Sequence, residues 1–413
     1  MSLTFNYHKD LPIGTLLKQK YLQEQVKVLK NIFQPEQKSK EWYEMRNNML
    51  TASDWGTILG ENHYSNSNIV LKKKCGDDTF ITNAAMQWGN KYESVAVLIY
   101  EHRNNVKILE FGCLQHPFIP FLGASPDGIT EDGIMLEIKC PTSRKITGIP
   151  PSYYWCQVQG QLEVCELDRC DFLECSIKEY IDEKTYLEDN YEQNYYLNNF
   201  GNEKGLVAEF YKKSTKTLFY EYSPVCLMNN ELEYWKNNII NKYDNYDDII
   251  FSCFSYWYLE EVSCVPIYRN QEWFNKAKIE LELFWNKVLK YRELGLDRLI
   301  YDINQEKEEK KNIKLELKLE LKNITKKTKE TKESKESTSK RQKKIKEFII
   351  LDDNKMVLED ISTISSDDEF ITNSKISMFT EISEDNSNEF ITTEIRDDDS
   401  NYFVTNSNIS MFT

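Results

Sequence analysis

Acidic residues and a lysine lie where a hydrolytic metal site could use them. Asp127 lies in a Ser-Pro-Asp-Gly turn, and Glu137 and Lys139 follow in the apolar run MLEIKC at 135–140. Because side chains alternate along a strand, Glu137 and Lys139 are expected on one face and Ile138 on the other. Charged groups inside an apolar strand cost desolvation free energy unless they serve each other or a metal ion.

Glu93 supplies a third carboxylate. It lies in the run 83–103, whose apolar residues recur at the three- and four-residue steps of a helix. Carboxylates that converge beside an ammonium suit Mg²⁺ or Mn²⁺, and two such ions about 3.5–4 Å apart can activate a water and stabilise the leaving oxygen of a phosphodiester. Taken singly, the residues could instead be a turn residue, a strand ion pair and a helix-surface charge. Their order along the chain, followed by a glutamine-rich helix, favours hydrolysis.

The segments around these residues predict an α/β domain. The run 83–103 is expected to be one helix, and 151–164 a second helix with a proline near its first turn. Between them, short apolar runs cut by Pro-Asp-Gly and Glu-Asp-Gly turns predict strands at 107–117, 121–129 and 135–140. The run 169–177 predicts a further strand. This order of helices and strands is typical of an α/β domain built on a mixed sheet.

The flanking segments are predicted to be helical. Residues 39–61 predict a helix, a turn and a second helix that begins at a Ser53-Asp54 N-cap. From 228 to 300 the pattern is helical, ending in a helix at 270–295. Residues 13–33 predict an N-terminal helix that precedes the domain, with Leu17, Tyr21, Val28 and Ile32 roughly on one side.

Charge patterning divides the chain into an N-terminal helical extension (1–38), a globular domain (39–298) and a low-complexity tail (299–413) that is expected to be disordered. Residues 301–350 carry 16 Lys/Arg and 10 Asp/Glu, whereas 351–413 carry 3 and 15. A basic block followed by an acidic block is typical of interaction tails. The alternating IKLELKLELK (313–322) predicts an isolated strand or an amphipathic stretch. The repeats EFIT and ISMFT could be docking peptides or low-complexity drift.

Composition excludes several classes of protein. The chain has 413 residues, of which 40% are hydrophobic, enough for a substantial core. It has no apolar run of membrane-spanning length and no export signal, so an intracellular protein is expected, in the host cytoplasm or nucleus if it is viral. The formal charge of −15 argues against whole-molecule attraction to nucleic acid. Ten cysteines without CxxC pairs predict buried thiols, and four histidines lack zinc-site spacing.

Four motifs in this order resemble a known family. They are WG-x-x-x-E (88–93), SPDG (125–128), EIKCP (137–141) and Y-x-x-x-Q-x-Q (153–159). They are similar to motifs of the YqaJ/lambda-exonuclease viral recombinase family of PD-(D/E)xK nucleases, over about residues 39–177. The resemblance implies a restriction-endonuclease-like core, in which helices flank a central mixed β-sheet.

The resemblance also implies roles for the motif residues. Asp127, Glu137 and the carbonyl of Ile138 would hold one metal ion, and Glu93 with Asp127 would hold a second. The implied cofactor is therefore Mg²⁺ or Mn²⁺, with two ions per site. Lys139 would act on the attacking water as a positive point charge.

Further residues match the family outside the acidic motifs. Gln157 would support the lysine or the water. Arg46 and Ser53 in RNNMLTAS, together with Ser125, resemble the pocket that holds a 5′-phosphate in lambda-type exonucleases. A guanidinium can bind a phosphate through two hydrogen bonds, and hydroxyls can complete the site. The alternatives are an exposed helix position for Arg46 and an N-cap for Ser53.

The implied activity is Mg²⁺-dependent 5′→3′ digestion of double-stranded DNA ends, leaving 3′ single strands for recombination or repair. The expected partners are DNA ends, a single-strand annealing protein and, as in lambda-type members, further copies of the chain in a homotrimer. Lysines 72–74 are expected to contact DNA or to form a solvated helix face. The alternatives are a resolvase-like, structure-specific endonuclease and a non-catalytic scaffold that binds DNA ends. No membrane partner is expected.

Overall fold

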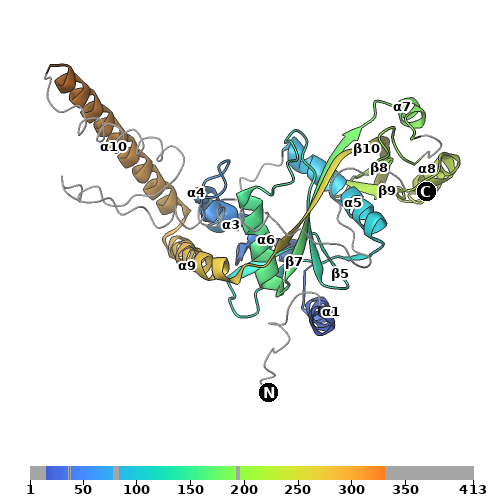
Figure 1. Cartoon of the computed structure of the whole chain (residues 1–413), viewed down its shortest axis with the longest axis horizontal. Coiled ribbons are helices and arrows are strands. Elements are labelled where there is room, and N and C mark those ends of the chain that lie inside the picture. The colour runs from blue at the N-terminus through green and yellow to red at the C-terminus, as the bar shows by residue number, and fades with distance from the viewer. Residues whose placement is uncertain (1–14, 36, 38, 78–82, 192–195, 331–413) are drawn as a thin grey trace, which may run out of the picture. The chain divides into compact units, whose positions relative to one another are not determined.

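A seven-stranded mixed sheet forms the centre of the computed structural model (Figure 1). The structure describes residues 15–330 except 36, 38, 78–82 and 192–195. The strands of this sheet, in spatial order, are β2 (Ile108–Leu109), β5 (Gly128–Thr130), β6 (Ile134–Lys139), β7 (Arg169–Glu179), β10 (Ile249–Tyr268), β8 (Lys204–Lys212) and β9 (Thr217–Tyr222). Strands β6 and β7 are parallel, and the other neighbours are antiparallel. The predicted mixed α/β fold is confirmed.

A small second sheet and the helices complete the described part. The second sheet has the order β1 (Leu50–Thr51), β4 (Leu122–Ala124) and β3 (Leu114–Gln115). The helices are α1 (Leu16–Asn31), α2 (Lys40–Asn47), α3 (Ala52–Ile58), α4 (Ser67–Lys74), α5 (Ala84–Asn104), α6 (Ser152–Cys165), α7 (Glu183–Glu188), α8 (Asn229–Asn241), α9 (Gln271–Leu294) and α10 (Leu296–Glu330).

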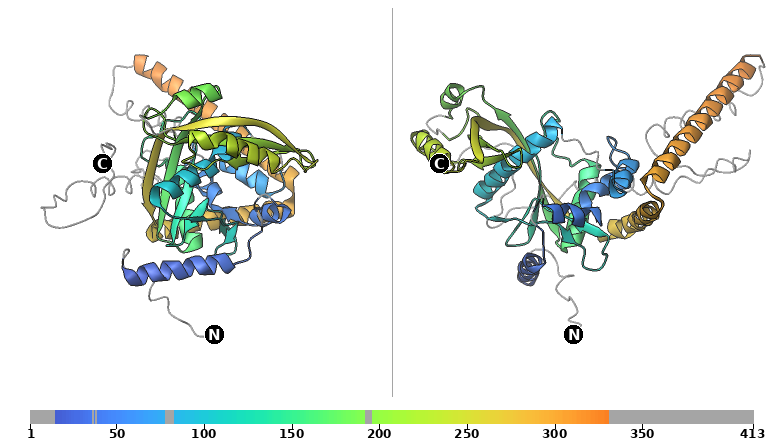
Figure 2. Two further views of the ribbon diagram at one scale, coloured as in Figure 1. Left: turned by 90° about the vertical axis from the view of Figure 1, so that its right-hand side faces the viewer. Right: turned by 180° about the vertical axis from the view of Figure 1, so that it is seen from behind.

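Helices α5 and α6 cover opposite faces of the large sheet around β6 and β7 (Figure 2). On one face, Met135 of β6 packs in a core with Val158 of α6. On the other face, Leu136 packs with Ile99 of α5. These side chains are all buried. Successive residues of β6 therefore point into two separate cores, which fixes the face on which each β6 side chain lies.

Glycines allow α3 and α6 to approach closely. A Cβ atom on Gly160 would lie 2.9 Å from the Cβ of Ala52, and one on Gly56 would lie 2.7 Å from the carbonyl oxygen of Tyr153. Neither position has room for a side chain. The two helices are therefore held at a fixed separation, which matters because each contributes residues to the candidate site.

Strand β10 lies within the region that was expected to be helical. The prediction of helices throughout 228–300 is wrong at Ile249–Tyr268, where a 20-residue strand pairs with β7 and β8. Its content of aromatic and β-branched residues is typical of a strand. Register shifts between Phe251 and Cys253 and between Leu259 and Glu261 interrupt its alternation, which weakens the period-two signal.

The N-terminal helix is present as α1, but its packed side differs from the expected one. Val26 and Leu29 are buried, whereas Leu17 and Val28, which were expected on one apolar side, are each 54% exposed. Lys18 also occupies a buried position, where its ammonium is ion-paired. A lysine on the packed side is the reason that the apolar pattern indicated the wrong face.

Helix α10 runs into the expected tail. Leu299 and Ile303 are buried against Val288 of α9. The expected domain end at 298 thus falls inside a packed element, and IKLELKLELK lies in a helix rather than a strand. The expected disorder of 331–413 concerns residues outside the described ones. Among the described helices, none has the length and apolar character needed to cross a bilayer.

Candidate active site

Glu137 is the centre of a hydrogen-bonded cluster between β6 and α6. We call Glu137, Lys139 and Gln157 the acid–lysine cluster. The side chain of Glu137 is fully buried. Its Oε1 accepts hydrogen bonds from Lys139 Nζ and, at 2.6 Å, from Gln157 Nε2, and its Oε2 accepts one from Gln161 Nε2 at 2.6 Å. Ile138 packs on the opposite face, in the α5 core. The expected sharing of one strand face by Glu137 and Lys139 is confirmed.

Neighbouring carboxylates keep Lys139 charged. Burial alone would lower the pKa of Lys139, but the charges of Glu137 and Asp127 outweigh burial and raise that pKa above its ordinary value. The ammonium also lies 4.8 Å from the ring centroid of Tyr154, in a cation–π contact. Lys139 is therefore a fixed positive charge rather than a proton acceptor.

Asp127 brings the three expected carboxylates within electrostatic reach of one another. Its Oδ2 accepts a hydrogen bond from the backbone N–H of Ile138 at 2.6 Å. Burial, followed by the charges of Glu137 and Glu93, raises the pKa of Asp127 well above its ordinary value. Glu93 is half-buried on α5. A helix, a turn and a strand thus contribute one acid each.

A divalent cation would suit the chemistry of these groups. Carboxylate and carbonyl oxygens are the ligands that Mg²⁺ and Mn²⁺ take, and a cation would offset the repulsion that raises the pKa of Asp127. Within 15–330, gaps aside, no group of three or more Asp, Glu, His or Cys side chains is already arranged to hold a metal ion. Both oxygens of Glu137 accept hydrogen bonds, and Oε2, with a single donor, keeps a lone pair with which it could bind a metal ion.

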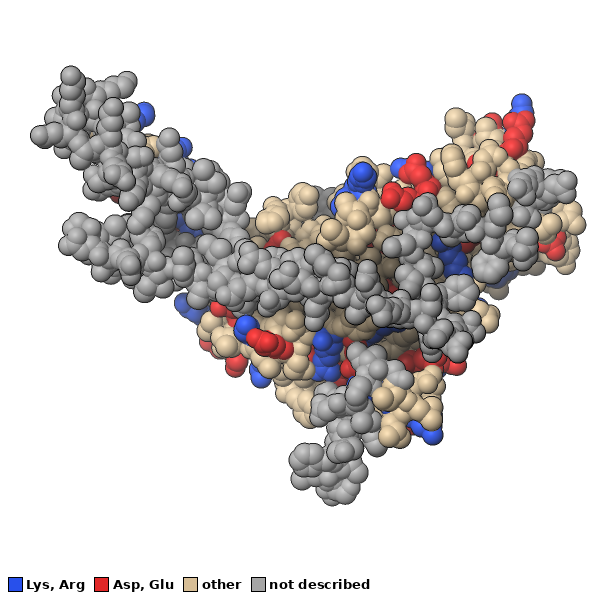
Figure 3. Space-filling model, viewed as in Figure 1, with Lys and Arg blue, Asp and Glu red and all other residues tan. Residues whose placement is uncertain are grey.

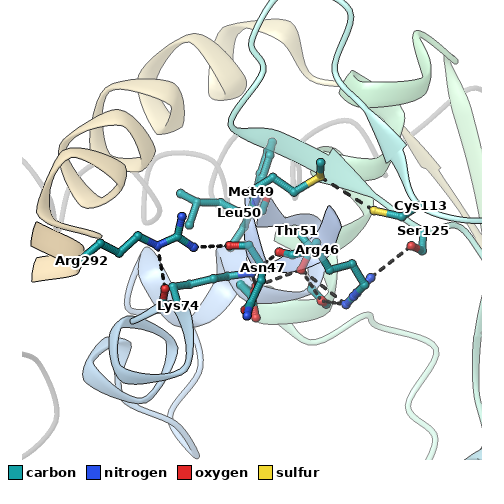
Figure 4. Close-up of polar contacts among 12 residues, drawn as sticks. Arg46, Asn47, Met49, Leu50, Thr51, Lys74, Cys113, Ser125 and Arg292 are labelled. Atoms are coloured by element: carbon teal, nitrogen blue, oxygen red, sulfur yellow. Dashed lines mark hydrogen bonds and ion pairs between the residues drawn. The ribbon is translucent and has the colours of Figure 1, made fainter. Parts of the chain in front are cut away.

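Arg46 and Ser125 lie together with two other hydroxyls (Figure 4). Arg46 Nη1 donates to Ser125 Oγ at 3.1 Å, and its Nη2 donates to Ser53 Oγ at 3.4 Å and to Thr51 Oγ1 at 3.5 Å. The guanidinium carbon lies 4.4 Å from the ring centroid of Trp42. We call Arg46, Thr51, Ser53 and Ser125 the guanidinium–hydroxyl cluster. The three residues expected to hold a phosphate are thus side by side.

The alternative interpretations of Arg46 and Ser53 are both wrong. Helix α3 begins at Ala52 with Thr51 as its N-cap, so Ser53 lies inside the first turn. Arg46 is half-buried and hydrogen-bonded rather than an exposed helix residue. Thr51 is itself fixed, because its Oγ1 donates to Asp54 Oδ2 at 2.9 Å. Ser53 is exposed, so the cluster is open to solvent at this residue.

Helices α4 and α9 hold the end of α2 in place. Lys74 Nζ donates to the carbonyl of Arg46 at 2.7 Å and pairs with Asp54 at 3.3 Å. Arg292 of α9 donates to the carbonyls of Asn47, at 2.5 Å, and Lys74, at 2.8 Å (Figure 4). Cations at the C-terminal ends of helices are stabilising. Because Lys74 is buried, its expected contact with DNA or solvent is wrong.

Gln161 joins the two clusters. Its Nε2 lies 2.6 Å from Glu137 Oε2 and 3.3 Å from the carbonyl oxygen of Ser125. The hydroxyl of Ser125 in turn accepts a hydrogen bond from Arg46. The guanidinium–hydroxyl cluster and the acid–lysine cluster are therefore connected through one buried side chain.

Sequence reasoning missed Gln161, although a signal existed. It lies four residues after Gln157 and so on the same face of α6. Gln159, which belongs to the Y-x-x-x-Q-x-Q motif, points elsewhere and donates to the carbonyl of Tyr268 at 2.8 Å. Nothing in the local sequence indicates Arg292, because its partners are backbone carbonyls more than two hundred residues away.

A basic residue close to the acid–lysine cluster is paired with an acid. Arg144, a basic residue beside the EIKCP motif, is paired with Glu174, a buried residue of β7 that lies in register with Lys139. On the face shown in Figure 3, acidic and basic side chains of the described residues are interspersed.

The fold and the site define an α/β protein in which a central strand carries Glu-x-Lys beside two further acids. Residues 41–168 match the family model of the YqaJ-like viral recombinase domain. This segment of the chain is therefore similar to the YqaJ-like viral recombinase domain, the family that the four motifs indicated.

Two viral proteins are similar to the chain in sequence. The chain is 37% identical over 318 residues to uncharacterized protein R354 of Acanthamoeba polyphaga mimivirus, in an alignment that covers 68% of this chain and 58% of that protein. It is 28% identical over 160 residues to a protein of African swine fever virus, in an alignment that covers 31% of this chain and 46% of that protein. The chain thus spans about half the length of these relatives.

Among solved structures, the chain is similar to an alkaline exonuclease, LHK-Exo, from Laribacter hongkongensis. The TM-score is 0.38 at 19% sequence identity, and the match covers 64% of this chain and 100% of that chain.

Proposed function

We propose that this protein is a metal-dependent deoxyribonuclease that removes nucleotides from the 5′ ends of double-stranded DNA. The observation that carries the proposal is the position of Gln161, which binds both Glu137 and the backbone of Ser125. A phosphate-binding group and a hydrolytic group held in fixed register are what stepwise removal from a chain end requires.

The metal ion belongs to the proposal as well. Glu93, Asp127, Glu137 and the carbonyl of Ile138 would hold Mg²⁺ or Mn²⁺, Glu137 through the free lone pair of its Oε2. When bound, such ions polarise the phosphate and lower the pKa of a coordinated water.

The chain's own side chains orient the reacting groups. The Lys139 ammonium offsets negative charge that develops on the scissile phosphate. Gln157 and Gln161 donate to different oxygens of Glu137 and so fix the rotation of its carboxylate. Neither glutamine titrates, so both side chains remain hydrogen-bond donors at any pH.

The guanidinium–hydroxyl cluster takes the terminal 5′-phosphate in this proposal. Arg46 supplies two donors and charge, and the hydroxyls of Ser53 and Ser125 complete the set. Such a contact carries no sequence information, but it sets the distance from the strand end to the scissile bond. Digestion then runs 5′→3′ and leaves a 3′ single strand for recombination or repair. Because the named relatives are viral, we place this activity inside an infected cell.

Digestion of an end-labelled linear duplex tests the proposal. The substrates carry either a 5′-phosphate or a 5′-hydroxyl, and each is incubated with Mg²⁺ or with Ca²⁺. We expect single-nucleotide release from the phosphorylated end in Mg²⁺, much slower release from the hydroxyl end, and none in Ca²⁺. Equal rates at the two ends would contradict the role of the guanidinium–hydroxyl cluster.

A closed circular plasmid distinguishes the alternatives. An exonuclease leaves it intact, whereas nicking would favour the resolvase-like endonuclease. Binding of duplex ends without any Mg²⁺- or Mn²⁺-dependent cleavage would favour the non-catalytic scaffold.

A further inference from the structure

A small cavity lies between the two clusters of the candidate site. Its volume is about 290 Å³. Ser53 of the guanidinium–hydroxyl cluster and Gln157 of the acid–lysine cluster both line it, so whatever occupies it lies between the two. We call it the tyrosine pocket. Its lining residues are Ser53, Gly56, Thr57, Asn62, Tyr64, Tyr153, Tyr154 and Gln157.

Aromatic rings form one side of the tyrosine pocket. The ring centroids of Tyr153 and Tyr154 lie 4.3 Å apart with an interplanar angle of 51°, and Tyr64 meets Tyr153 edge-on at 6.2 Å and 85°. Tyr153 and Tyr154 are half-buried. Tyr64, in contrast, is 86% exposed, so most of its ring is available to a ligand.

The loop that presents Tyr64 is fixed to α3. The backbone N–H of Tyr64 donates to Asn62 Oδ1 at 3.0 Å, and Asn62 Nδ2 donates to Thr57 Oγ1 at 3.0 Å. The N–H of Asn62 donates to the carbonyl of Gly56 at 3.0 Å. The exposed ring therefore stands on an ordered backbone, which reduces the entropy lost when a ligand binds against it.

The lining indicates the class of ligand. Among the residues that the structure describes, no Asp, Glu, Lys, Arg or His lines the pocket, so it does not suit a phosphate. Aromatic side chains stack on nucleobases without strong dependence on sequence. The volume lies near the lower end of the roughly 300–1,000 Å³ of small-molecule pockets, which suits one nucleoside rather than a base pair.

We propose that the tyrosine pocket holds the unpaired base of the 5′-terminal nucleotide, with Tyr64 as its stacking partner. The inference rests on the proposed function, since it takes the 5′-phosphate to lie at Arg46 and the scissile phosphate at Glu137. The nucleoside between these two phosphates then falls beside Ser53 and Gln157, which both line the pocket. The terminal base pair must open before its base can enter.

The test measures binding of duplex ends in Ca²⁺, separately from cleavage. Two 5′-phosphorylated duplexes are compared, one with a normal terminal nucleotide and one whose terminal nucleotide is abasic. We expect the wild type to bind the abasic end about tenfold more weakly, and Tyr64→Ala to bind both ends with equal affinity. Tyr64→Phe, which keeps the ring, should behave as the wild type. Because Tyr64 is exposed, these substitutions leave the fold intact.

A matched control is Tyr234→Ala, which removes a tyrosine that is 73% exposed on α8 and lies outside the pocket. It should keep the wild-type preference for the base-bearing end. Equal binding of both ends by the wild type, or an unchanged preference in Tyr64→Ala, would overturn the inference. Digestion of the normal end is measured separately in Mg²⁺. If no nucleotides are released, the proposed nuclease activity is contradicted, whereas the ratio of the two binding affinities still tests the role of the tyrosine pocket.

Discussion

Arg46 is the residue whose removal should separate recognition of a DNA end from hydrolysis. It contacts three hydroxyls but no member of the acid–lysine cluster directly, since Ser125 and Gln161 lie between them. A hydrogen bond to a charged group contributes about 1.5–3 kcal/mol, which corresponds to about 10- to 100-fold in rate or affinity.

Arg46→Ala is therefore expected to lower kcat/KM on a 5′-phosphorylated duplex by about 10- to 100-fold, to near the value for the 5′-hydroxyl end. Arg46→Lys should recover part of the loss, because an ammonium supplies charge without the two-pronged geometry. The control is Lys40→Ala, which removes an exposed cation from the same helix. An Arg46→Ala enzyme that still prefers phosphorylated ends would count against the cluster.

Glu163 is expected to make the free energy of unfolding fall at acid pH. Burial alone would raise the pKa of Glu163, but His116 and Arg269 outweigh it and lower that pKa below its ordinary value. A carboxyl whose pKa is lower in the folded state than in the unfolded state stabilises the fold. This contribution to the free energy of unfolding is complete at pH values above the unfolded-state pKa, and it is lost as the pH falls through the folded-state pKa. We expect Glu163→Gln to lower the free energy of unfolding at about pH 7 and to lower it less at about pH 3. A difference that is constant with pH in urea titrations would contradict this.

The candidate site was predictable where its residues follow a local pattern. Alternation in LEIK indicates the shared face of Glu137 and Lys139, and helical spacing from Gln157 leads to Gln161. Arg292 was not predictable, because it donates to backbone carbonyls that carry no sequence signature. Long-range backbone contacts of this kind depend on the assembled fold.

Close contact between α3 and α6 sets the distance between the two clusters of the site. The first helix carries Ser53 and the second carries Gln157 and Gln161. Glycines at 56 and 160 permit the approach. A larger residue at either position would push the two helices, and with them the two clusters, apart.

We expect Gly160→Ala to destabilise the fold by about 1–3 kcal/mol, because the new methyl group would meet Ala52 and Trp55 at about 3 Å. Gly89→Ala is the matched control, since Gly89 is also helical and no atom of the described residues lies within 4 Å of its Cβ position. That change should stabilise by about 0.5–1 kcal/mol through helix propensity. Urea unfolding of both variants measures the difference, and equal effects would contradict close packing.

Elements were predictable where the periodicity is unbroken. The helix α5 and the strand β7 match their apolar runs closely. Strand β10 was missed because two register shifts interrupt its alternation, and the packed face of α1 was misassigned because buried Lys18 replaces an apolar residue. In both cases tertiary contacts override the local pattern.

The packing of α10 bears on where the folded domain ends. Leu299 and Ile303 of α10 are buried against α9, beyond the boundary at 298 that charge patterning indicated. We therefore propose that the folded domain includes the first turns of α10. The homotrimer and the annealing partner stay predictions.

Two truncations test that boundary. A chain ending at residue 330 should keep the thermal stability and the nuclease activity of the full chain. A chain ending at 298 loses two buried side chains, each of which contributes roughly 2–5 kcal/mol in core truncations, so its melting temperature should fall clearly. Equal melting temperatures of the two chains would contradict this proposal and support a domain end at residue 298.

Asp127→Asn tests the hydrolytic site most directly. Asparagine can accept the same hydrogen bond from the Ile138 N–H, and it removes one of three mutually repelling carboxylates. The melting temperature without metal should therefore stay the same or rise. The rate of Mg²⁺-dependent nucleotide release from a 5′-phosphorylated duplex should fall by at least about 100-fold. Release within a few-fold of the wild-type rate would contradict a metal site built on Asp127.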